Sequence, residues 1–238
     1  MLVMVGMKFG STGDEGRTWA VNAYLAGMVC ERFHRSRIVA FSTGNVYGLT
    51  PVARGGSVET DLLTPQGEYA MTAVGRERLY EHFSRTLNLP LVLLRLNYAT
   101  ELRYGVLVDI AQRVLAGQPV DLHMGNLNAL WQGDANAMAL AAFAHAASPP
   151  TVLNLAGPEI LSVRRVAEQF ATLFGRPVTF VGTESPDALL SNGQLAHRQF
   201  GYPRLPIGRL IEWIADWLRR GGPTHGKPTH FEVRDGKF

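Results

Sequence analysis

The residues of this chain that could move a proton are a serine–threonine pair and a tyrosine. Ser42 and Thr43 close an apolar strand, and a Gly-Asn-Val-Tyr-Gly turn follows them. Tyr69 lies 26 residues after Thr43, at the start of an expected helix. A phenol has an unperturbed pKa near ~10, which is too high for a base at neutral pH. Tyr69 could therefore act as a base only where its surroundings favour the phenolate.

The hydroxyl and the phenol at this separation resemble the catalytic pair of the extended short-chain dehydrogenase/reductases, the NAD-dependent epimerase/dehydratase family. Further segments carry the same resemblance. Residues 5–11 are similar to the Ala-Gly-Leu-Lys stretch of UDP-glucose 4-epimerases, and Asn22 matches an asparagine on the family's next helix. Residues 131–135 resemble the Val-x-Asp-Val-Ala motif, residues 154–163 resemble the family's strand, glycine turn and capped helix, and residues 195–203 resemble its Ala-x-x-x-Leu-Gly-Trp-x-Pro motif. Their order and spacing, from residue 2 to about 220, identify the chain as a member of that family.

The resemblance implies a role for each matching residue. Tyr69 would be the general base or acid toward a sugar hydroxyl, and Thr43 would bond the same oxygen. The implied cofactor contacts come from Gly6, Lys8 and Tyr69, and the implied substrate contacts from Ser42, Thr43, Asn97 and Tyr98. Lys8 could equally be a surface lysine in a loop. Asn97 and Tyr98 could instead pack at a strand end, because the family's Arg-x-x-Asn is one residue short here.

The chain departs from the family pattern at the lysine of Tyr-x-x-x-Lys, where Ala73 stands. Ala73 offers neither a charge nor a hydrogen bond to the cofactor ribose. Arg76 lies seven residues after Tyr69, on the same helical face, and could supply some positive field. A guanidinium differs from an ammonium in reach and geometry. We therefore favour an Arg76 that is solvated or ion-paired beside Glu77.

The strand, GxxGxxG loop and helix that cradle a pyrophosphate are absent from this sequence. Glycines at 10, 13 and 16 have the right spacing, but acidic residues between them would repel phosphate, so a loop into the next helix is favoured. In the family register, residue 2 lies at the fourth strand of the sheet. We expect an open, apolar edge strand there. An upstream gene start, a natural remnant and a chain that pairs with another all remain possible.

Strand and helix signals alternate along the chain, which predicts an α/β fold with a mainly parallel sheet. The expected strands cover 2–5, 37–41, 90–96, 151–155 and 177–181, and the expected helices 19–33, 69–87, 106–116, 135–147, a segment capped by Ser162 and running to 174, and one after Pro206. We predict an incomplete Rossmann-like sheet flanked by helices (1–105), a small C-terminal substrate lobe interleaved with the sheet (106–220) and a flexible tail (221–238).

Composition excludes several classes of protein. The net charge of +3 is scattered and forms no basic stripe with aromatics, which argues against a nucleic-acid partner. No apolar stretch is long enough for a membrane span, and the histidines show no metal-ligand spacing. The single cysteine, Cys30, excludes an internal disulfide and fits a reducing compartment, so we expect a cytoplasmic protein.

Two functions therefore remain open. The first is an NAD- or NADP-dependent epimerase or dehydratase that transfers hydride reversibly on a nucleotide sugar, working as a homodimer as the family often does. The second is a degenerate, non-catalytic homologue that binds a nucleotide sugar or a protein partner. Thr43 and Tyr69 favour the first, whereas Ala73 and the missing glycine-rich loop favour the second.

Overall fold

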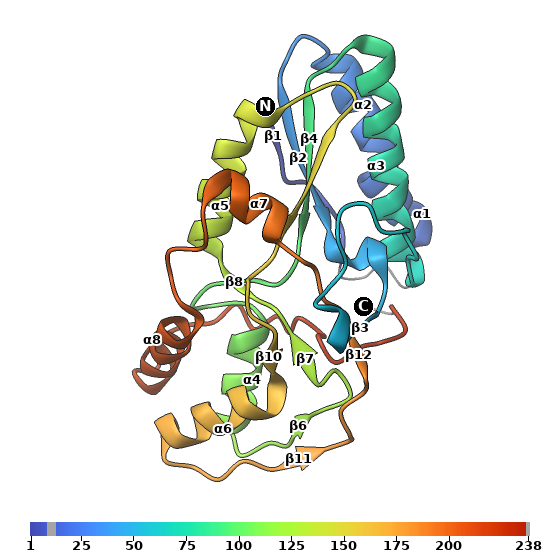
Figure 1. The fold of residues 1–238 in the computed structure, drawn as a ribbon. Coiled ribbons are helices and arrows are strands. Elements are labelled where there is room, and N and C mark those ends of the chain that lie inside the picture. Colours follow the sequence, from blue (N-terminus) through green and yellow to red (C-terminus); the bar gives the residue numbers. More distant parts are fainter. Residues whose placement is uncertain (9–12, 237–238) are drawn as a thin grey trace.

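The computed structural model describes residues 1–8 and 13–236, and its centre is a parallel sheet of four strands (Figure 1). The strands are β1 Leu2–Val3, β2 Ile38–Thr43, β4 Leu91–Leu96 and β9 Thr151–Leu155, in the order β1-β2-β4-β9. The register pairs Ser42 with Arg95 and Thr43 with Leu96. The polar carboxyl ends of β2 and β4 therefore meet at one edge of the sheet.

Helices cover both faces of this sheet, with α2 Leu25–Arg32 and α3 Gly67–Leu87 on one side and α5 Gln132–Ala141 and α7 Gln194–Phe200 on the other (Figure 1). The strands are apolar on both faces, as a doubly covered parallel sheet requires. In β4, Leu91 and Leu93 pack toward the first pair of helices, whereas Val92 and Leu94 pack toward the second. Cys30 is buried in the first of these cores.

The other elements are short or belong to a second lobe. The remaining helices are α1 Glu15–Trp19, η1 Ala20–Tyr24, η2 Gly44–Tyr47, η3 Val52–Arg54, α4 Val106–Leu115, η4 Ala142–His145, α6 Val163–Phe174 and α8 Ile207–Arg219. The remaining strands pair as β3 Thr50–Pro51 with β12 Asp187–Ala188, β5 Ala99–Thr100 with β8 Leu130–Trp131, β6 Val120–Asp121 with β11 Phe180–Val181, and β7 Asn126–Leu127 with β10 Leu161–Ser162.

The second lobe is built mainly from α4, α6 and α8, which bury their apolar faces against one another (Figure 1). Strands β6, β7, β10 and β11 lie in the same lobe. The segment between residues 130 and 155 returns to the sheet as α5 and β9, so the lobes are interleaved along the chain. The predicted α/β fold class is confirmed, and the boundaries at residues 105 and 220 stay a proposal.

Most expected elements form at or near their expected residues. Ser162 caps α6, since its hydroxyl accepts from the Arg165 N–H, and α6 ends at Phe174 before a left-handed Gly175. The helix expected over 19–33 begins earlier, at Glu15, and its second turn is the π-helical η1. Strand β1 ends at Val3, earlier than expected, and pairs only with β2 in the part of the chain that is described.

The C-terminal segment differs from the loose tail that its composition predicts. Residues 229–236, which we call the C-terminal strap, lie against both lobes. Phe231 is only 2% exposed and belongs to the core of α4, α6 and α8. The Thr229 N–H and hydroxyl donate to the Asp109 carboxylate at 2.7 and 2.5 Å. Arg234 forms an ion pair with Asp187. Composition could not reveal these partners, because all of them are distant in sequence.

The strap makes a testable contribution to stability. We expect Phe231→Ala to lower the free energy of unfolding by about 3–5 kcal/mol, because it opens a cavity in the lobe core. Phe33→Ala is the matched control: Phe33 is 40% exposed, so its loss should cost less than about 1 kcal/mol. Urea denaturation of both variants measures this. Equal costs for the two would show that the strap does not pack in solution.

Candidate active site

A cleft of about 370 Å³ opens at the carboxyl end of the sheet, between the two lobes. Ligands bind at this edge in open α/β sheets. Every site residue that the sequence predicts contributes to its wall: Gly6, Lys8, Ser42, Thr43, Tyr69, Asn97 and Tyr98. The fold thus brings together side chains that are up to 92 residues apart along the chain. Their chemical roles stay predictions.

Tyr69 and Thr43 enter the cleft from different elements. Tyr69 lies in the first turn of α3, which begins at Gly67 in a left-handed conformation (φ +76°) that favours glycine. Thr43 ends β2 and caps η2: its Oγ1 accepts from the Asn45 N–H at 3.2 Å and donates to Asn45 Oδ1 at 3.1 Å. A strand end and a helix start therefore present the hydroxyl and the phenol to one space.

A buried ion pair fixes α3 to the sheet beneath these two residues. The guanidinium of Arg95 on β4 donates to the Glu77 carboxylate of α3, with Nη2 2.7 Å from Oε2. The Ser42 hydroxyl donates to Oε1 of the same carboxylate at 2.5 Å. Ser42 lines the cleft, but its single proton is used inside the protein. The hydrogen bonds and charge of Glu77 raise the pKa of Arg95 above its ordinary value, despite its burial.

Tyr47 completes this network and has a structural role. Its hydroxyl donates to Asn154 Oδ1 at 2.7 Å and accepts from Arg95 Nη1 at 2.6 Å. The Arg95 guanidinium also lies over the Tyr47 ring, 4.9 Å from the centroid. Burial raises the pKa of Tyr47 to about 12, against the lowering effect of Arg95. Tyr47 therefore stays protonated and is not a base.

Asn97 and Tyr98, which follow β4, both reach the cleft. The Asn97 amide is buried and donates to Asn128 Oδ1 at 2.8 Å. Tyr98 adopts a left-handed conformation (φ +44°), which is uncommon for an aromatic residue and directs the chain from the sheet to the second lobe. Burial raises the pKa of Tyr98 well above its ordinary value. Asn97 and Tyr98 thus pack at the end of the strand and also line the cleft, so the two alternatives drawn from the sequence do not exclude each other.

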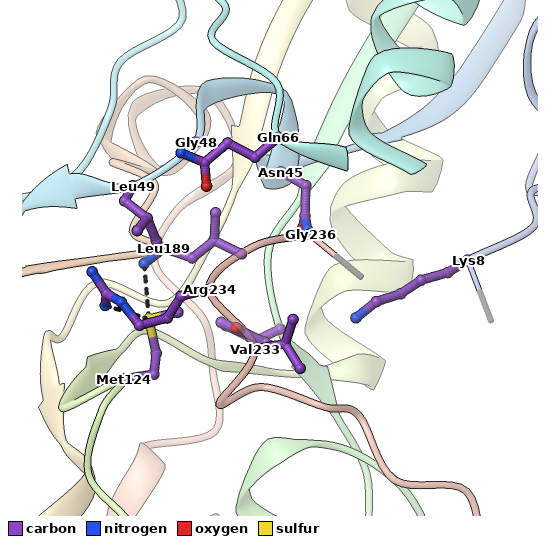
Figure 2. A pocket seen from close by; sticks show the side chains of 11 residues that line it. Lys8, Asn45, Gly48, Leu49, Gln66, Met124, Leu189, Val233, Arg234 and Gly236 are labelled. Atoms are coloured by element: carbon purple, nitrogen blue, oxygen red, sulfur yellow. Dashed lines mark hydrogen bonds between the residues drawn. The ribbon is translucent and has the colours of Figure 1, made fainter. Parts of the chain in front are cut away.

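Lys8 contacts the C-terminal strap. Its ammonium donates to the Thr229 carbonyl at 3.1 Å, and it lines both the cleft and an adjoining smaller cavity of about 30 Å³. Figure 2 shows that smaller cavity, with Lys8 on the opposite side from Met124 and Arg234, and with Val233 of the strap between them. Burial lowers the pKa of Lys8 to about 8, although Asp109 and Glu232 raise it. Lys8 is partly exposed in a segment without regular secondary structure, and its role toward a cofactor stays a prediction.

Arg76 is not the solvated or Glu77-paired side chain that we favoured from the sequence. It is 6% exposed and lines the cleft, while Glu77 pairs with Arg95. Its guanidinium donates from Nε to the Asn22 carbonyl (3.0 Å), from Nη2 to Asn22 Oδ1 (2.6 Å) and from Nη1 to the Phe41 carbonyl (2.9 Å). The sequence did not show that residues 22 and 41 lie beside α3.

Asn22 has a larger part in the site than its sequence match indicated. Its amide bonds both backbone polar groups of Met7, at 2.7 and 2.9 Å, and donates to the Thr72 hydroxyl at 2.9 Å. It lies in the π-helical η1, and π-helical turns are frequent at functional sites. Asn22 therefore joins the segment before residue 8, helix α3 and the guanidinium of Arg76.

Ala73 lies in an apolar cluster with Val46 and Tyr47 and has no exposed surface. It does not line the cleft. The glycine-spaced loop considered as a phosphate site lies partly outside the described residues, at 9–12. In its described part, the Glu15 carboxylate accepts from the Gly13 N–H.

Sequence reasoning missed several polar residues of the cleft wall, namely Asn45, Tyr104, Gln132, Asn136 and Thr229. Of these, only Asn45 and Gln132 lie within sequence motifs that could have indicated them.

The complete set of cleft residues shows the electrostatic character of the site. Two cations, Lys8 and Arg76, line the cleft, and no aspartate or glutamate of the described residues does. Such a cleft suits an anionic ligand.

Comparison with solved structures identifies the fold. The chain superposes on MoeE5 in complex with UDP-glucose and NAD with a TM-score of 0.77, at 20% identity, covering 92% of this chain and 79% of MoeE5. The chain has the fold of the NAD-dependent epimerases and dehydratases. The UDP-glucuronic acid 4-epimerase of Bacillus cereus gives a TM-score of 0.76 at 17% identity, covering 92% of this chain and 75% of that protein.

A third epimerase/dehydratase structure, the dTDP-glucose 4,6-dehydratase of Bacillus anthracis in complex with NAD, gives a TM-score of 0.74 at 17% identity, covering 87% and 70% of the two chains. No family model and no curated protein matches the sequence. The fold that the sequence motifs indicated is thus confirmed by structure. Identity this low carries the fold and not the activity.

Two further classes of site find no support in the described part of the chain. It contains no group of three or more histidine, cysteine, aspartate or glutamate side chains that could hold a metal ion. None of its helices combines the length and the apolar character needed to cross a membrane.

The Glu77–Arg95 pair yields a prediction for stability. We expect Glu77→Gln to lower the free energy of unfolding by about 3–5 kcal/mol, because it leaves the buried guanidinium of Arg95 without its counter-charge. Glu81→Gln, one turn further along α3, removes only exposed pairs with Arg78 and Arg85 and should cost less than about 1 kcal/mol. Chemical denaturation of both variants decides. Similar losses would contradict the role given to the buried pair.

Lys8 yields a prediction for pH dependence. Its pKa in the folded protein, about 8, lies below its ordinary value of 10.5. Between these pH values the unfolded chain binds more protons, so raising the pH favours the folded state at this residue. The free energy of unfolding of the wild type should therefore rise relative to that of Lys8→Met from pH 8 to pH 10. A difference that stays constant over this range would exclude the lowered pKa.

Proposed function

We propose that this chain belongs to the NAD-dependent epimerase/dehydratase family and transfers hydride reversibly on a nucleotide sugar. One observation carries the proposal: Tyr69 and Thr43 line the same cleft at the carboxyl edge of the sheet. Lys8 and Arg76 line it as well, and no aspartate or glutamate of the described residues does. Sugar nucleotides and nicotinamide dinucleotides are both anionic. The shared fold with MoeE5, whose structure contains UDP-glucose and NAD, supports the same ligand classes.

The residues present fit a dinucleotide on the side of the cleft formed by Gly6, Lys8 and Arg76. Gly6 has no side chain to fill this wall, and the ammonium and the guanidinium offer positive charge. When bound there, NAD or NADP would supply the acceptor for a hydride from the sugar carbon.

Tyr69 is the proposed proton carrier. As the C–H bond of the sugar carbinol loses its hydride, the hydroxyl proton of the same carbon passes to the phenolate oxygen of Tyr69, and a ketone forms. The reverse transfer, with the hydride delivered to the opposite face, produces the epimer. Thr43 donates a hydrogen bond to the same sugar oxygen, and this requires its hydroxyl to leave Asn45 Oδ1. Both groups act in general acid–base catalysis.

The nucleotide of the sugar substrate is assigned to the side of the cleft nearer the second lobe. Asn97 and Tyr98 lie there, with Gln132 and Asn136 at the start of α5. The side-chain amides of Asn97, Gln132 and Asn136 offer neutral donors and acceptors, which suit base and ribose groups. Ser42 contributes less to substrate binding than the sequence implied, since its proton is held by Glu77.

A non-catalytic binding protein is the second candidate. The observation that favours it is Ala73, which is buried in an apolar cluster where the family motif has a lysine. Such a protein would keep affinity for the anionic ligands without turnover. The homodimer that the sequence resemblance implies and the cytoplasmic location that the composition indicates remain proposals under either function.

Calorimetric titration and assay of the Tyr69→Phe variant test the proposal. We expect the wild type to bind NADH or NADPH and to interconvert a UDP-hexose with its 4-epimer, or to dehydrate it. Tyr69→Phe should lower turnover by about 10²–10⁴-fold, because it removes the proton carrier, while the affinity for NADH changes little. Tyr24→Phe, at an exposed tyrosine outside the cleft, is the matched control and should leave both quantities unchanged.

The outcomes separate the two candidate functions. Turnover in the wild type that is lost in Tyr69→Phe supports the enzyme. Binding of NADH or a UDP-sugar without turnover supports the non-catalytic protein. Absence of binding to NADH, NADPH and UDP-sugars would rule out both ligand-binding proposals.

A further inference from the structure

We infer that Arg76 replaces the missing lysine of the Tyr-x-x-x-Lys motif as the cation that binds the nicotinamide half of the dinucleotide. This inference rests on the proposed function. The motif position itself, Ala73, is buried away from the cleft, whereas Arg76 lines it. The positive charge of the site would thus come from one turn further along the same helix.

Helix geometry brings the guanidinium back toward the motif. Long side chains on a helix point toward its N-terminus, so the charged end of Arg76 lies over the preceding turn. Asn22 fixes this position, because it bonds Arg76 Nη2 at 2.6 Å and the Thr72 hydroxyl at 2.9 Å. Asn22 therefore links the guanidinium of Arg76 to the Thr72 hydroxyl, one turn back along the same helix.

The charge of Arg76 is buried and has no carboxylate partner in an ion pair, over the residues that the structure describes. A buried cation of this kind is costly unless hydrogen bonds or a ligand compensate for it. Three of the five guanidinium N–H groups bond Asn22 and Phe41, which leaves one on Nη1 and one on Nη2. These two donors can serve an electronegative ligand.

The guanidinium of Arg76 lies against Gly6 at the wall of the cleft. A Cβ atom at Gly6 would lie 2.9 Å from Nη2 and 3.4 Å from Nη1 of Arg76, so only glycine permits this close approach. Gly6 lines the cleft as well. The absence of a side chain at residue 6 therefore leaves the guanidinium within reach of a ligand.

The position of Arg76 relative to Tyr69 indicates which half of the dinucleotide Arg76 would contact. Hydride transfer requires the nicotinamide beside the sugar carbon that Tyr69 and Thr43 serve. Arg76 lies on the same face of α3 as Tyr69, two turns along. The oxygen atoms nearest to it then belong to the ribose or the phosphate of the nicotinamide half.

The test is the affinity for NADH of purified variants of the 238-residue chain, measured by calorimetry. Arg76→Gln removes the charge and should weaken NADH binding by about 10-fold or more, as expected for loss of a charge-assisted hydrogen bond. Arg76→Lys keeps the charge and should retain more affinity than Arg76→Gln. Arg78→Gln, an exposed arginine on the same helix, is the matched control and should bind NADH like the wild type.

Two further measurements separate a ligand contact from a structural role. The affinity for UDP should be the same in Arg76→Gln and the wild type, because the substrate nucleotide is assigned to the other side of the cleft. Gly6→Ala should also weaken NADH binding, and its effect should shrink in the Arg76→Gln background, since both changes disturb one contact. If Arg76→Gln does not fold, Gly6→Ala and Arg76→Lys supply the comparison with the wild type.

The results distinguish this inference from the function on which it rests. Equal NADH affinities in the wild type and a folded Arg76→Gln would overturn the role of Arg76 and leave the proposed function intact. Equal losses of NADH and UDP affinity would also overturn it, because they indicate a collapsed cleft. A wild type that binds neither NADH nor NADPH would overturn both.

Discussion

The geometry of the cleft depends on the buried ion pair between Glu77 and Arg95. This pair connects the middle of α3 to β4, and Ser42 adds a bond from β2 to the same carboxylate. The helix that carries Tyr69 is thereby held at a fixed height above the strand that ends in Thr43. A buried pair of this kind adds little net stability compared with apolar residues, but it strongly penalises arrangements that separate its members. It therefore specifies position more than it contributes free energy.

Arg76, which directly precedes Glu77 in α3, has a different environment. Helix neighbours point about 100° apart, so Glu77 faces the sheet while Arg76 faces Asn22 and the cleft. One guanidinium is neutralised inside the protein, and the other keeps its charge available at the wall of the site. The acid-free lining of the cleft has the same consequence. No carboxylate of the described residues lines the cleft itself, although Asp109 and Glu232 lie near enough to Lys8 to raise its pKa.

The C-terminal strap shows how a segment without regular secondary structure can be ordered by tertiary contacts. Phe231 enters the lobe core, Thr229 donates to the partly buried Asp109 carboxylate, and Arg234 pairs with Asp187. The strap also brings the Thr229 carbonyl to Lys8 on the sheet side. It therefore connects the two lobes at the side of the cleft, and its position makes Thr229 part of the cleft wall.

The sequence by itself determined the fold class, most of the regular elements and the residues that meet at the carboxyl edge of the sheet. These depend on local patterns: apolar runs such as Leu91–Leu96, a cap such as Ser162, and motif spacings such as Thr43 to Tyr69. Only the tertiary structure decided the environment of Arg76, the partner of Glu77, the lowered pKa of Lys8 and the packing of the strap. Each of these depends on which distant groups surround a side chain once water is excluded, and no local pattern in the chain records that.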